Sequence, residues 1–97
     1  MKVAVLGATG YTGMVLLRLL ADHPGVERII AVSSSKAGVK VSDFDHGFPA
    51  SGKLEPESYV DIAAARAAGV DTAFACLPHL KSAELCADFI GNSVVID

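Results

Sequence analysis

Three glycines near the start of the chain, Gly7, Gly10 and Gly13, have the type and spacing of a turn that binds phosphate. They follow an apolar run and precede a helix-like stretch, which is the setting in which such a turn works. The first glycine permits a tight turn off a strand, the second lets a pyrophosphate approach the backbone, and the third lets the helix pack closely. Backbone N–H groups at the positive end of the helix would then face the phosphate. The residues predicted to contact a dinucleotide here are Gly7, Thr9, Gly10, Tyr11, Thr12 and Gly13.

A second set of candidate residues is the run S-S-S-K that follows Val32. Domains that bind NAD usually place an Asp or Glu at this point, where it accepts hydrogen bonds from the ribose 2′-OH. No acid is present here, and Glu27 lies at the opposite end of the preceding apolar run. Hydroxyls and an ammonium suit a 2′-phosphate instead. We therefore predict NADP rather than NAD, with contacts from Ser33, Ser34 and Lys36; a polar loop without a ligand is the alternative.

A third set follows the apolar run 72–77. Ligands of open α/β sheets bind beyond the carboxyl ends of the strands, so Leu77, Pro78 and His79 are predicted cofactor contacts. His79 is equally consistent with an ordinary solvated histidine. Cys76 and His79 form C-x-x-H, but a metal site needs three or four ligands and there is no second cluster in the sequence. We predict no metal site and assign no catalytic residue. Cys76, in an apolar strand, and Cys86, on a helix, are interpreted as core thiols.

The elements that must position these residues are visible as apolar runs and helix-like stretches. The runs are continuous rather than alternating, which is typical of parallel strands covered on both faces; they span 3–6, 29–32, 72–77 and 94–96. Helices are expected over about 11–23, 61–68 and 80–90, with a short one near 42–46. This order predicts an α/β domain, a Rossmann-type doubly wound parallel sheet. The apolar face expected for the first helix is Val15, Leu16, Leu19 and Leu20.

Composition supports one globular domain. The chain has 97 residues, of which 52% are hydrophobic and 20% are charged. A net charge of -3 gives no reason to expect nucleic acid as a partner, and no apolar stretch approaches the about 20 residues that span a bilayer. The 2 cysteines favour a reducing, cytoplasmic setting. Because the chain stops on the last apolar run, we expect residues 1–97 to be a dinucleotide-binding domain truncated before a second, catalytic domain.

Several motifs in this order resemble a known family. They are G-A-T-G-Y-T-G at 7–13, the serine run followed by A-G, V-S-D at 41–43, L-P-H at 77–79 with S-A-E-L at 82–85, and the closing V-V-I-D. Together they resemble the N-terminal part of N-acetyl-γ-glutamyl-phosphate reductase, an enzyme of arginine biosynthesis. The likeness covers nearly the whole chain. The glycine motif is shared with many reductases, and its combination with L-P-H is much more specific.

The resemblance implies a two-domain, homo-oligomeric, cytoplasmic enzyme that uses NADPH. Such enzymes reduce N-acetyl-γ-glutamyl phosphate to N-acetylglutamate semialdehyde and release phosphate; a cysteine thiolate forms a thioester and a histidine acts as acid and base. In the family, that cysteine lies in a motif beyond residue 97, and neither Cys76 nor Cys86 matches it. Residues 1–97 alone are therefore predicted to be inactive. Many relatives carry an arginine in or just after the serine run, where this chain has Ser35 and Lys36.

Three other readings share parts of this pattern. Aspartate-semialdehyde dehydrogenase has the same architecture and thioester chemistry. Extended short-chain reductases open with a similar turn but need a Tyr-x-x-x-Lys pair, and Tyr59 is followed four residues later by Ala63. A non-catalytic nucleotide-binding regulatory module would also fit the residues present.

Overall fold

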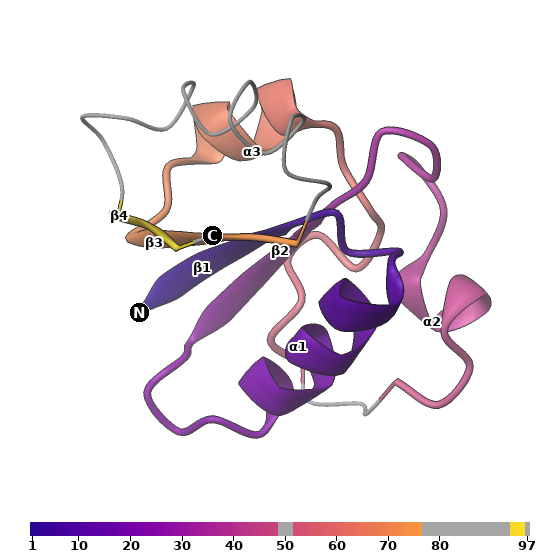
Figure 1. The fold of residues 1–97 in the computed structure, drawn as a ribbon, viewed down its shortest axis with the longest axis horizontal. Coiled ribbons are helices and arrows are strands. Elements are labelled where there is room, and N and C mark those ends of the chain that lie inside the picture. Colours follow the sequence, from indigo (N-terminus) through magenta and orange to yellow (C-terminus); the bar gives the residue numbers. More distant parts are fainter. Residues whose placement is uncertain (49–51, 77–93, 97) are drawn as a thin grey trace.

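The computed structural model describes residues 1–48, 52–76 and 94–96 (Figure 1). The predicted helix over 80–90 lies outside the described residues, as do Leu77, Pro78, His79 and Cys86. The remaining elements predicted from the sequence are all present, with boundaries that differ by a few residues.

The sheet has four parallel strands in the order β2-β1-β3-β4. They are β1 (Lys2–Leu6), β2 (Arg28–Val32), β3 (Thr72–Ala75) and β4 (Val94–Ile96). The register pairs Leu6 with Val32 on one side and with Ala75 on the other, so three strands end at the same level. Strand β1 is central: β2 lies on one side of it, and β3 and then β4 lie on the other. The carboxyl ends of β1 and β3 therefore mark the topological switch point, where sheets of this kind bind ligands.

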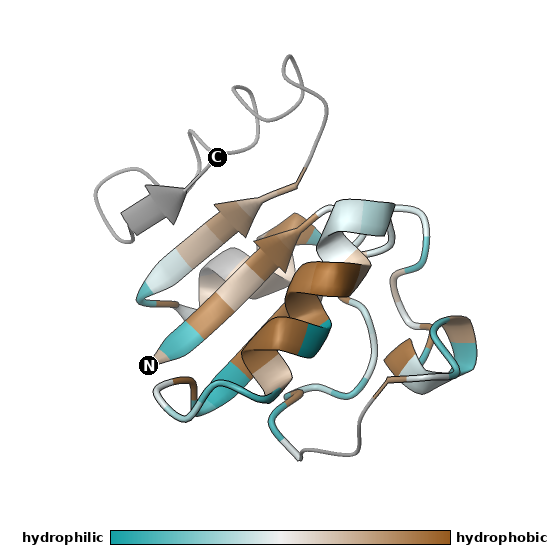
Figure 2. Ribbon diagram, turned by 60° about the horizontal axis from the view of Figure 1, so that its bottom comes forward, coloured by the Kyte–Doolittle hydropathy of each residue, from teal (hydrophilic) through white to brown (hydrophobic). Residues whose placement is uncertain are grey.

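Helix α1 (Tyr11–Ala21) buries a different face from the one expected. The predicted face was wrong for two of its members, because Val15 is 41% exposed and Leu19 is 64% exposed. The face that packs on the sheet carries Gly13, Leu17, Leu20 and Ala21. Gly13 and Ala21 are small, so this face of α1 can pack closely. The sequence prediction considered only large apolar residues and therefore missed them. Figure 2 shows the apolar residues that α1 carries along its length.

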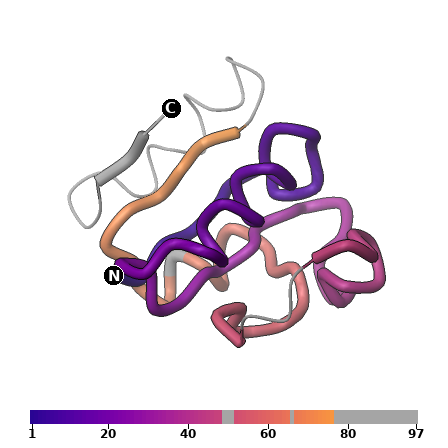
Figure 3. The backbone as a smooth tube through the Cα atoms, turned by 90° about the horizontal axis from the view of Figure 1, so that it is seen from below, coloured from indigo at the N-terminus to yellow at the C-terminus, as the bar shows by residue number. Residues whose placement is uncertain are grey.

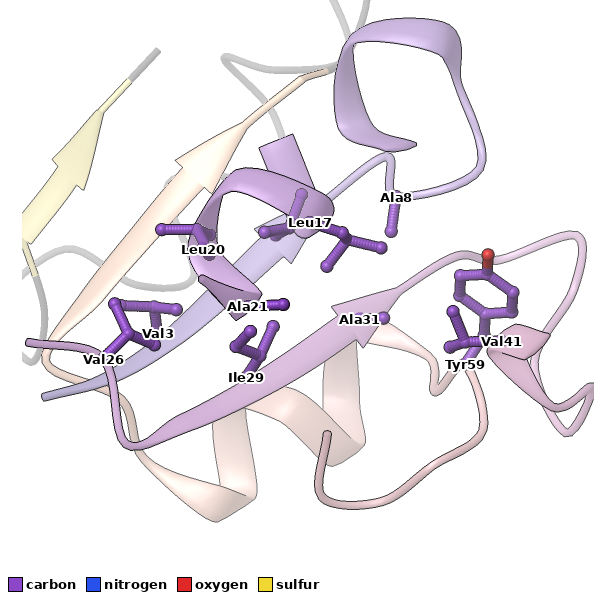
Figure 4. Packing of buried hydrophobic residues seen from close by; sticks show 11 residues of the cluster. Val3, Ala8, Leu17, Leu20, Ala21, Val26, Ile29, Ala31, Val41 and Tyr59 are labelled. Carbon is purple, nitrogen blue, oxygen red and sulfur yellow. The ribbon is translucent and has the colours of Figure 1, made fainter. Parts of the chain in front are cut away.

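Helices α1 and α3 (Ile62–Ala68) cover opposite faces of the sheet (Figure 1). Side chains of β1 alternate: Val3 and Val5 join the cluster under α1, whereas Ala4 and Leu6 join the cluster under α3. Both faces are thus buried, as the continuous apolar runs predicted. The cluster under α1 is drawn in Figure 4. It is the larger of the two and extends past the sheet to Val41 and Tyr59.

Helix α3 has a defined beginning and end. The Asp61 carboxylate accepts a hydrogen bond from the backbone N–H of Ala64 at 2.9 Å, which is the N-cap arrangement. Gly69, with φ +72°, follows the last helical residue and has the left-handed conformation of a C-terminal cap.

The chain between β2 and α3 forms a separate layer beside the sheet, seen on the right of Figure 1 and from below in Figure 3. The short predicted helix is confirmed as α2 (Val41–Phe44). Backbone hydrogen bonds hold the segment that leads into α2. The Tyr59 N–H donates to the Val39 carbonyl at 2.9 Å, the Gly38 N–H donates to the Tyr59 carbonyl at 2.8 Å, and the Val41 N–H donates to the Glu57 carbonyl at 3.0 Å. These bonds fix the loop after β2 without regular secondary structure.

An ion pair ties this layer to α1. The Arg18 side chain donates from Nε to Oδ2 of Asp45 at 3.1 Å and from Nη2 to Oδ1. Asp45 is 4% exposed, and the hydrogen bond from Arg18 holds the pKa of this carboxyl below its usual value. The same bond raises the pKa of Arg18. A sequence pattern gives no signal for this pair, because 27 positions separate its members.

Candidate functional site

The glycine turn, residues 7–13, leaves β1 and is fastened to the end of β2. Gly7 has φ 76°, a left-handed conformation that favours glycine, as predicted for the tight turn off the strand. The backbone N–H groups of Gly7 and Ala8 both donate to the carbonyl of Val32, at 3.1 and 3.0 Å, and Gly10 donates to the Gly7 carbonyl at 3.1 Å. These bonds tie the turn to the end of β2.

Gly10 and Gly13 differ in what surrounds them. A Cβ added at Gly13 would lie 2.3 Å from the Gly7 carbonyl oxygen and 2.9 Å from the Ala8 Cα, which is far inside contact distance. Gly13 thus allows the helix to pack closely, as predicted, although its immediate neighbours are the turn rather than the sheet. A Cβ added at Gly10 would meet only the Gly7 oxygen, at an ordinary 3.5 Å. Packing therefore does not require glycine at position 10.

The N-terminus of α1 offers donors to an anion. Gly10 is the N-cap residue and has no side chain to accept a hydrogen bond from the first turn. The first intrahelical bond is from Met14 to Gly10, at 2.9 Å. In the described part of the chain, no acceptor pairs with the N–H groups of Tyr11, Thr12 and Gly13. The first turn carries no acidic residue. Donors at the positive end of a helix, without a nearby carboxylate, favour phosphate binding.

The serine loop, residues 33–40, meets the glycine turn through hydroxyl groups. The Ser33 and Thr9 hydroxyls lie 3.2 Å apart, and the Ser33 hydroxyl also lies 3.4 Å from that of Ser35. Ser33 is 5% exposed and accepts a hydrogen bond from the Lys36 backbone N–H at 3.2 Å. The structure therefore brings together two sets of residues that the sequence proposed separately. Ser33 shapes the loop from within, whereas Ser34 and Lys36 are exposed.

Charges around the serine loop favour an anion. The loop holds Lys36 and Lys40 and no acidic residue. Glu27 lies at the amino end of β2, 81% exposed and 3.8 Å from the N-terminal ammonium, as its position in the sequence predicted. The position at which an NAD-specific domain usually places a carboxylate is occupied by the Ser33 hydroxyl.

An aromatic pair next to the serine loop was not anticipated from the sequence. The Lys36 ammonium lies 5.7 Å from the centroid of the Phe44 ring. That ring contacts Tyr59 edge to face, with centroids 5.9 Å apart and an interplanar angle of 85°. No motif connects these residues; the fold brings them together.

The third predicted set is only partly described. Cys76 lies just beyond β3, half-buried, and its backbone N–H donates to the Leu6 carbonyl at 2.9 Å. The expectation that it lies inside a strand was wrong by one residue, because the described strand ends at Ala75. The predicted contacts from Leu77, Pro78 and His79 lie outside the described residues.

Two further kinds of site were searched for in residues 1–48, 52–76 and 94–96. In those ranges, no group of three or more His, Cys, Asp or Glu side chains is placed to hold a metal ion. Within the same ranges no helix is both long and apolar enough to cross a bilayer.

Comparison with known proteins adds to this geometry. Residues 2–97 match the family described as semialdehyde dehydrogenase, NAD binding domain. The N-acetyl-gamma-glutamyl-phosphate reductase of Halalkalibacterium halodurans is 41% identical over 90 residues, which is 93% of this chain and 26% of that protein. The enzyme of the same name from Cereibacter sphaeroides is 40% identical over 97 residues, which is 99% of this chain and 27% of that protein. The enzyme of that name from Azotobacter vinelandii is 60% identical over 43 residues, which is 44% of this chain and 12% of that protein.

The chain thus spans about a quarter of the length of the curated relatives it matches. Among solved structures, aspartate semialdehyde dehydrogenase with NADP from Candida albicans has a TM-score of 0.67 at 24% identity. The match covers 97% of this chain and 28% of that one, and it supports the Rossmann-type fold.

Proposed function

The chain belongs to the family of semialdehyde dehydrogenase NAD-binding domains, and we propose that it binds NADP(H) for an acyl-phosphate reductase. The proposed reaction is the reduction of N-acetyl-γ-glutamyl phosphate to N-acetylglutamate semialdehyde and phosphate. It is the activity in the names of relatives that are 35% to 41% identical over nearly all of this chain. The proposal includes a longer, two-domain enzyme, of which residues 1–97 are the cofactor domain.

One observation carries the cofactor assignment: the glycine turn and the serine loop contact each other. Thr9 and Ser33 join them by their hydroxyls at 3.2 Å, at the carboxyl ends of β1 and β2. The turn supplies N–H donors, and the loop supplies exposed hydroxyls and the Lys36 ammonium. A pyrophosphate and a ribose 2′-phosphate are the two anionic groups of NADP(H); the turn suits the first and the loop suits the second.

The described residues hold and orient the cofactor and perform no covalent step. The bound nicotinamide supplies the hydride. The N–H groups of Tyr11 and Thr12 bind the pyrophosphate, while Ser34 and Lys36 bind the 2′-phosphate. Ser33 shapes the loop between them. Leu77, Pro78 and His79 are proposed as further cofactor contacts, on their position in the sequence after β3. The thiolate and the acid–base group belong to the proposed second domain, which also supplies the substrate pocket.

Two further features are proposed for the complete protein. We expect a homo-oligomer located in the cytoplasm, on the resemblance to a biosynthetic reductase and on the composition of the chain. Sedimentation of the product of the complete native gene tests the first, because a monomer at micromolar concentration contradicts it.

The function is tested with the product of the complete native gene. Purified protein should consume NADPH in the presence of N-acetyl-γ-glutamyl phosphate, and in the reverse direction should require phosphate and the semialdehyde. Aspartyl phosphate serves as the competing substrate, since preference for it would assign the protein to the aspartate-semialdehyde branch of the family. Gly10→Glu should abolish cofactor binding and turnover while circular dichroism stays unchanged.

A further inference from the structure

The ammonium of Lys36 lies over the ring of Phe44, a residue to which the proposed function assigns no role. We propose that Phe44 is a positioning residue: it holds the Lys36 ammonium where a ribose 2′-phosphate binds and so contributes to the preference for NADP(H) over NAD(H). This inference rests on the proposed function, because it concerns how strongly the same site binds the phosphorylated cofactor.

The backbone of Lys36 is fixed on both sides. Its N–H donates to the Ser33 hydroxyl at 3.2 Å, and its carbonyl accepts from Val39 at 2.9 Å. The position of the ammonium is therefore decided by the four-carbon side chain alone. A lysine side chain at an exposed site samples many rotamers, and each one that is lost on ligand binding weakens that binding.

Phe44 provides a surface that restricts those rotamers. It is the last residue of α2 and is half-buried. Its ring packs edge to face on Tyr59, which is 1% exposed and is bonded through its backbone to Val39 and Gly38. The Lys36 nitrogen lies 5.7 Å from the Phe44 centroid, within the range of a cation–π interaction. Phe44 thus connects the charged group to the core.

An aromatic ring suits this task better than a carboxylate. An acidic partner would neutralise the ammonium and repel the incoming phosphate, whereas the ring attracts the cation and carries no net charge. Lys36 forms no ion pair with a carboxylate in the part of the chain that the structure describes. The ammonium has three donors, so contact with the ring leaves hydrogens for phosphate oxygens.

The test compares dissociation constants for NADPH and NADH, measured by calorimetry on the product of the complete native gene. Phe44→Leu keeps an apolar side chain and removes the ring. It should raise the Kd for NADPH about two- to fivefold, the effect of losing one exposed cation–π contact, and leave that for NADH unchanged. Phe44→Tyr should restore the wild-type ratio. Phe48→Leu, at a half-buried phenylalanine packed against the same cluster, is the matched control and should change neither constant.

The outcomes separate this inference from the function on which it rests. If Lys36→Gln removes the preference for NADPH but Phe44→Leu does not change it, the positioning role is wrong and the site stands. Tighter NADPH binding by Phe44→Leu would show that the ring holds the ammonium away, which also overturns the role. A wild-type protein without preference for NADPH contradicts both. Should Phe44→Leu fail to fold, 3,5-difluorophenylalanine at position 44 keeps the shape, weakens the ring's negative face and should give the same loss.

Discussion

The glycine turn and the serine loop meet at the end of β2 but are held in different ways. The turn is defined by its backbone: Gly7 needs a positive φ, and Gly13 sits where a Cβ would lie 2.3 Å from a carbonyl oxygen. The loop is held by backbone hydrogen bonds with Tyr59 and by a side chain, the buried Ser33 hydroxyl, and the layer that it enters is tied to α1 by the Arg18–Asp45 pair. Backbone packing tolerates almost no substitution, whereas side-chain networks lose stability in smaller steps. The predictions below test this difference in order of expected size.

The largest effect is expected at Gly13. Gly13→Ala places a methyl group against the Gly7 carbonyl and the Ala8 Cα, neither of which can move without displacing β1. We expect the free energy of unfolding to fall by about 3 kcal/mol or more, measured by urea denaturation. Gly10→Ala is the control, because its Cβ has an ordinary 3.5 Å contact. It should keep its stability but weaken NADPH binding. Equal stability for the two variants would show that the turn is not limited by packing.

A smaller effect is expected at the ion pair that ties α1 to the layer beside the sheet. Asp45→Asn leaves Arg18 opposite a neutral amide and should cost about 1–2 kcal/mol, since the arginine is 47% exposed and solvent screens part of the interaction. The pair also predicts a pH dependence. The pKa of Asp45 in the folded state is lowered, so its contribution is present above the unfolded pKa of about 4 and is lost as the pH falls through the folded value. The Asn variant should lack this component of acid destabilisation.

Denaturant midpoints at pH 7 and at about pH 3 measure that difference. Parallel losses in wild type and Asp45→Asn between the two values would mean that the carboxylate contributes nothing to acid stability.

These two regions also show how far the sequence could be read. The spacing of Gly7, Gly10 and Gly13 and the missing acid after β2 are local patterns, so the sequence predicted the fold correctly. That the same residues contact the cofactor stays a prediction. The buried face of α1 was predicted wrongly in part: Val15 and Leu19 are exposed, whereas Leu20 is buried and Leu16 packs against the core. The small residues Gly13 and Ala21 are buried instead, and a pattern of large apolar residues does not reveal them.

The same limit applies to the layer beside the sheet. The Phe44–Tyr59 contact and the Arg18–Asp45 pair join residues that are far apart in sequence, and their geometry depends on irregular backbone held by single hydrogen bonds. No period or motif encodes such contacts, so sequence reasoning could not find the supports of the serine loop.

The next effect in size, below that of Asp45→Asn, is expected at Ser33. Ser33→Ala removes the acceptor of the Lys36 N–H and the contact with Thr9, at a cost of about 1 kcal/mol. Because the loop then loses its internal bond, the Kd for NADPH should rise more than the Kd for NADH. Thermal melts with and without each cofactor measure both consequences. Ser34→Ala, at an exposed position in the same run, is the matched control for stability, and a melt as low as that of Ser33→Ala would remove the special role given to Ser33.

The smallest effect is expected at Tyr59. Its hydroxyl is buried and has no hydrogen-bond partner among the described residues, and burial raises its pKa. Tyr59→Phe deletes that group and keeps the ring in the cluster of Figure 4. Stability should change by less than about 0.5 kcal/mol or rise slightly, because an unpaired buried hydroxyl costs free energy in the folded state. A loss above about 1 kcal/mol would reveal a partner for the hydroxyl.

The central claim is that one surface, made of the glycine turn and the serine loop, binds the two phosphate-bearing parts of NADP(H). The most direct measurement is a crystal structure of the product of the complete native gene with NADPH bound. We predict the pyrophosphate over the N–H groups of Tyr11 and Thr12, and the 2′-phosphate within hydrogen-bonding distance of Ser34 and the Lys36 ammonium. A cofactor whose 2′-phosphate points into solvent, or whose pyrophosphate lies away from the turn, would contradict the account.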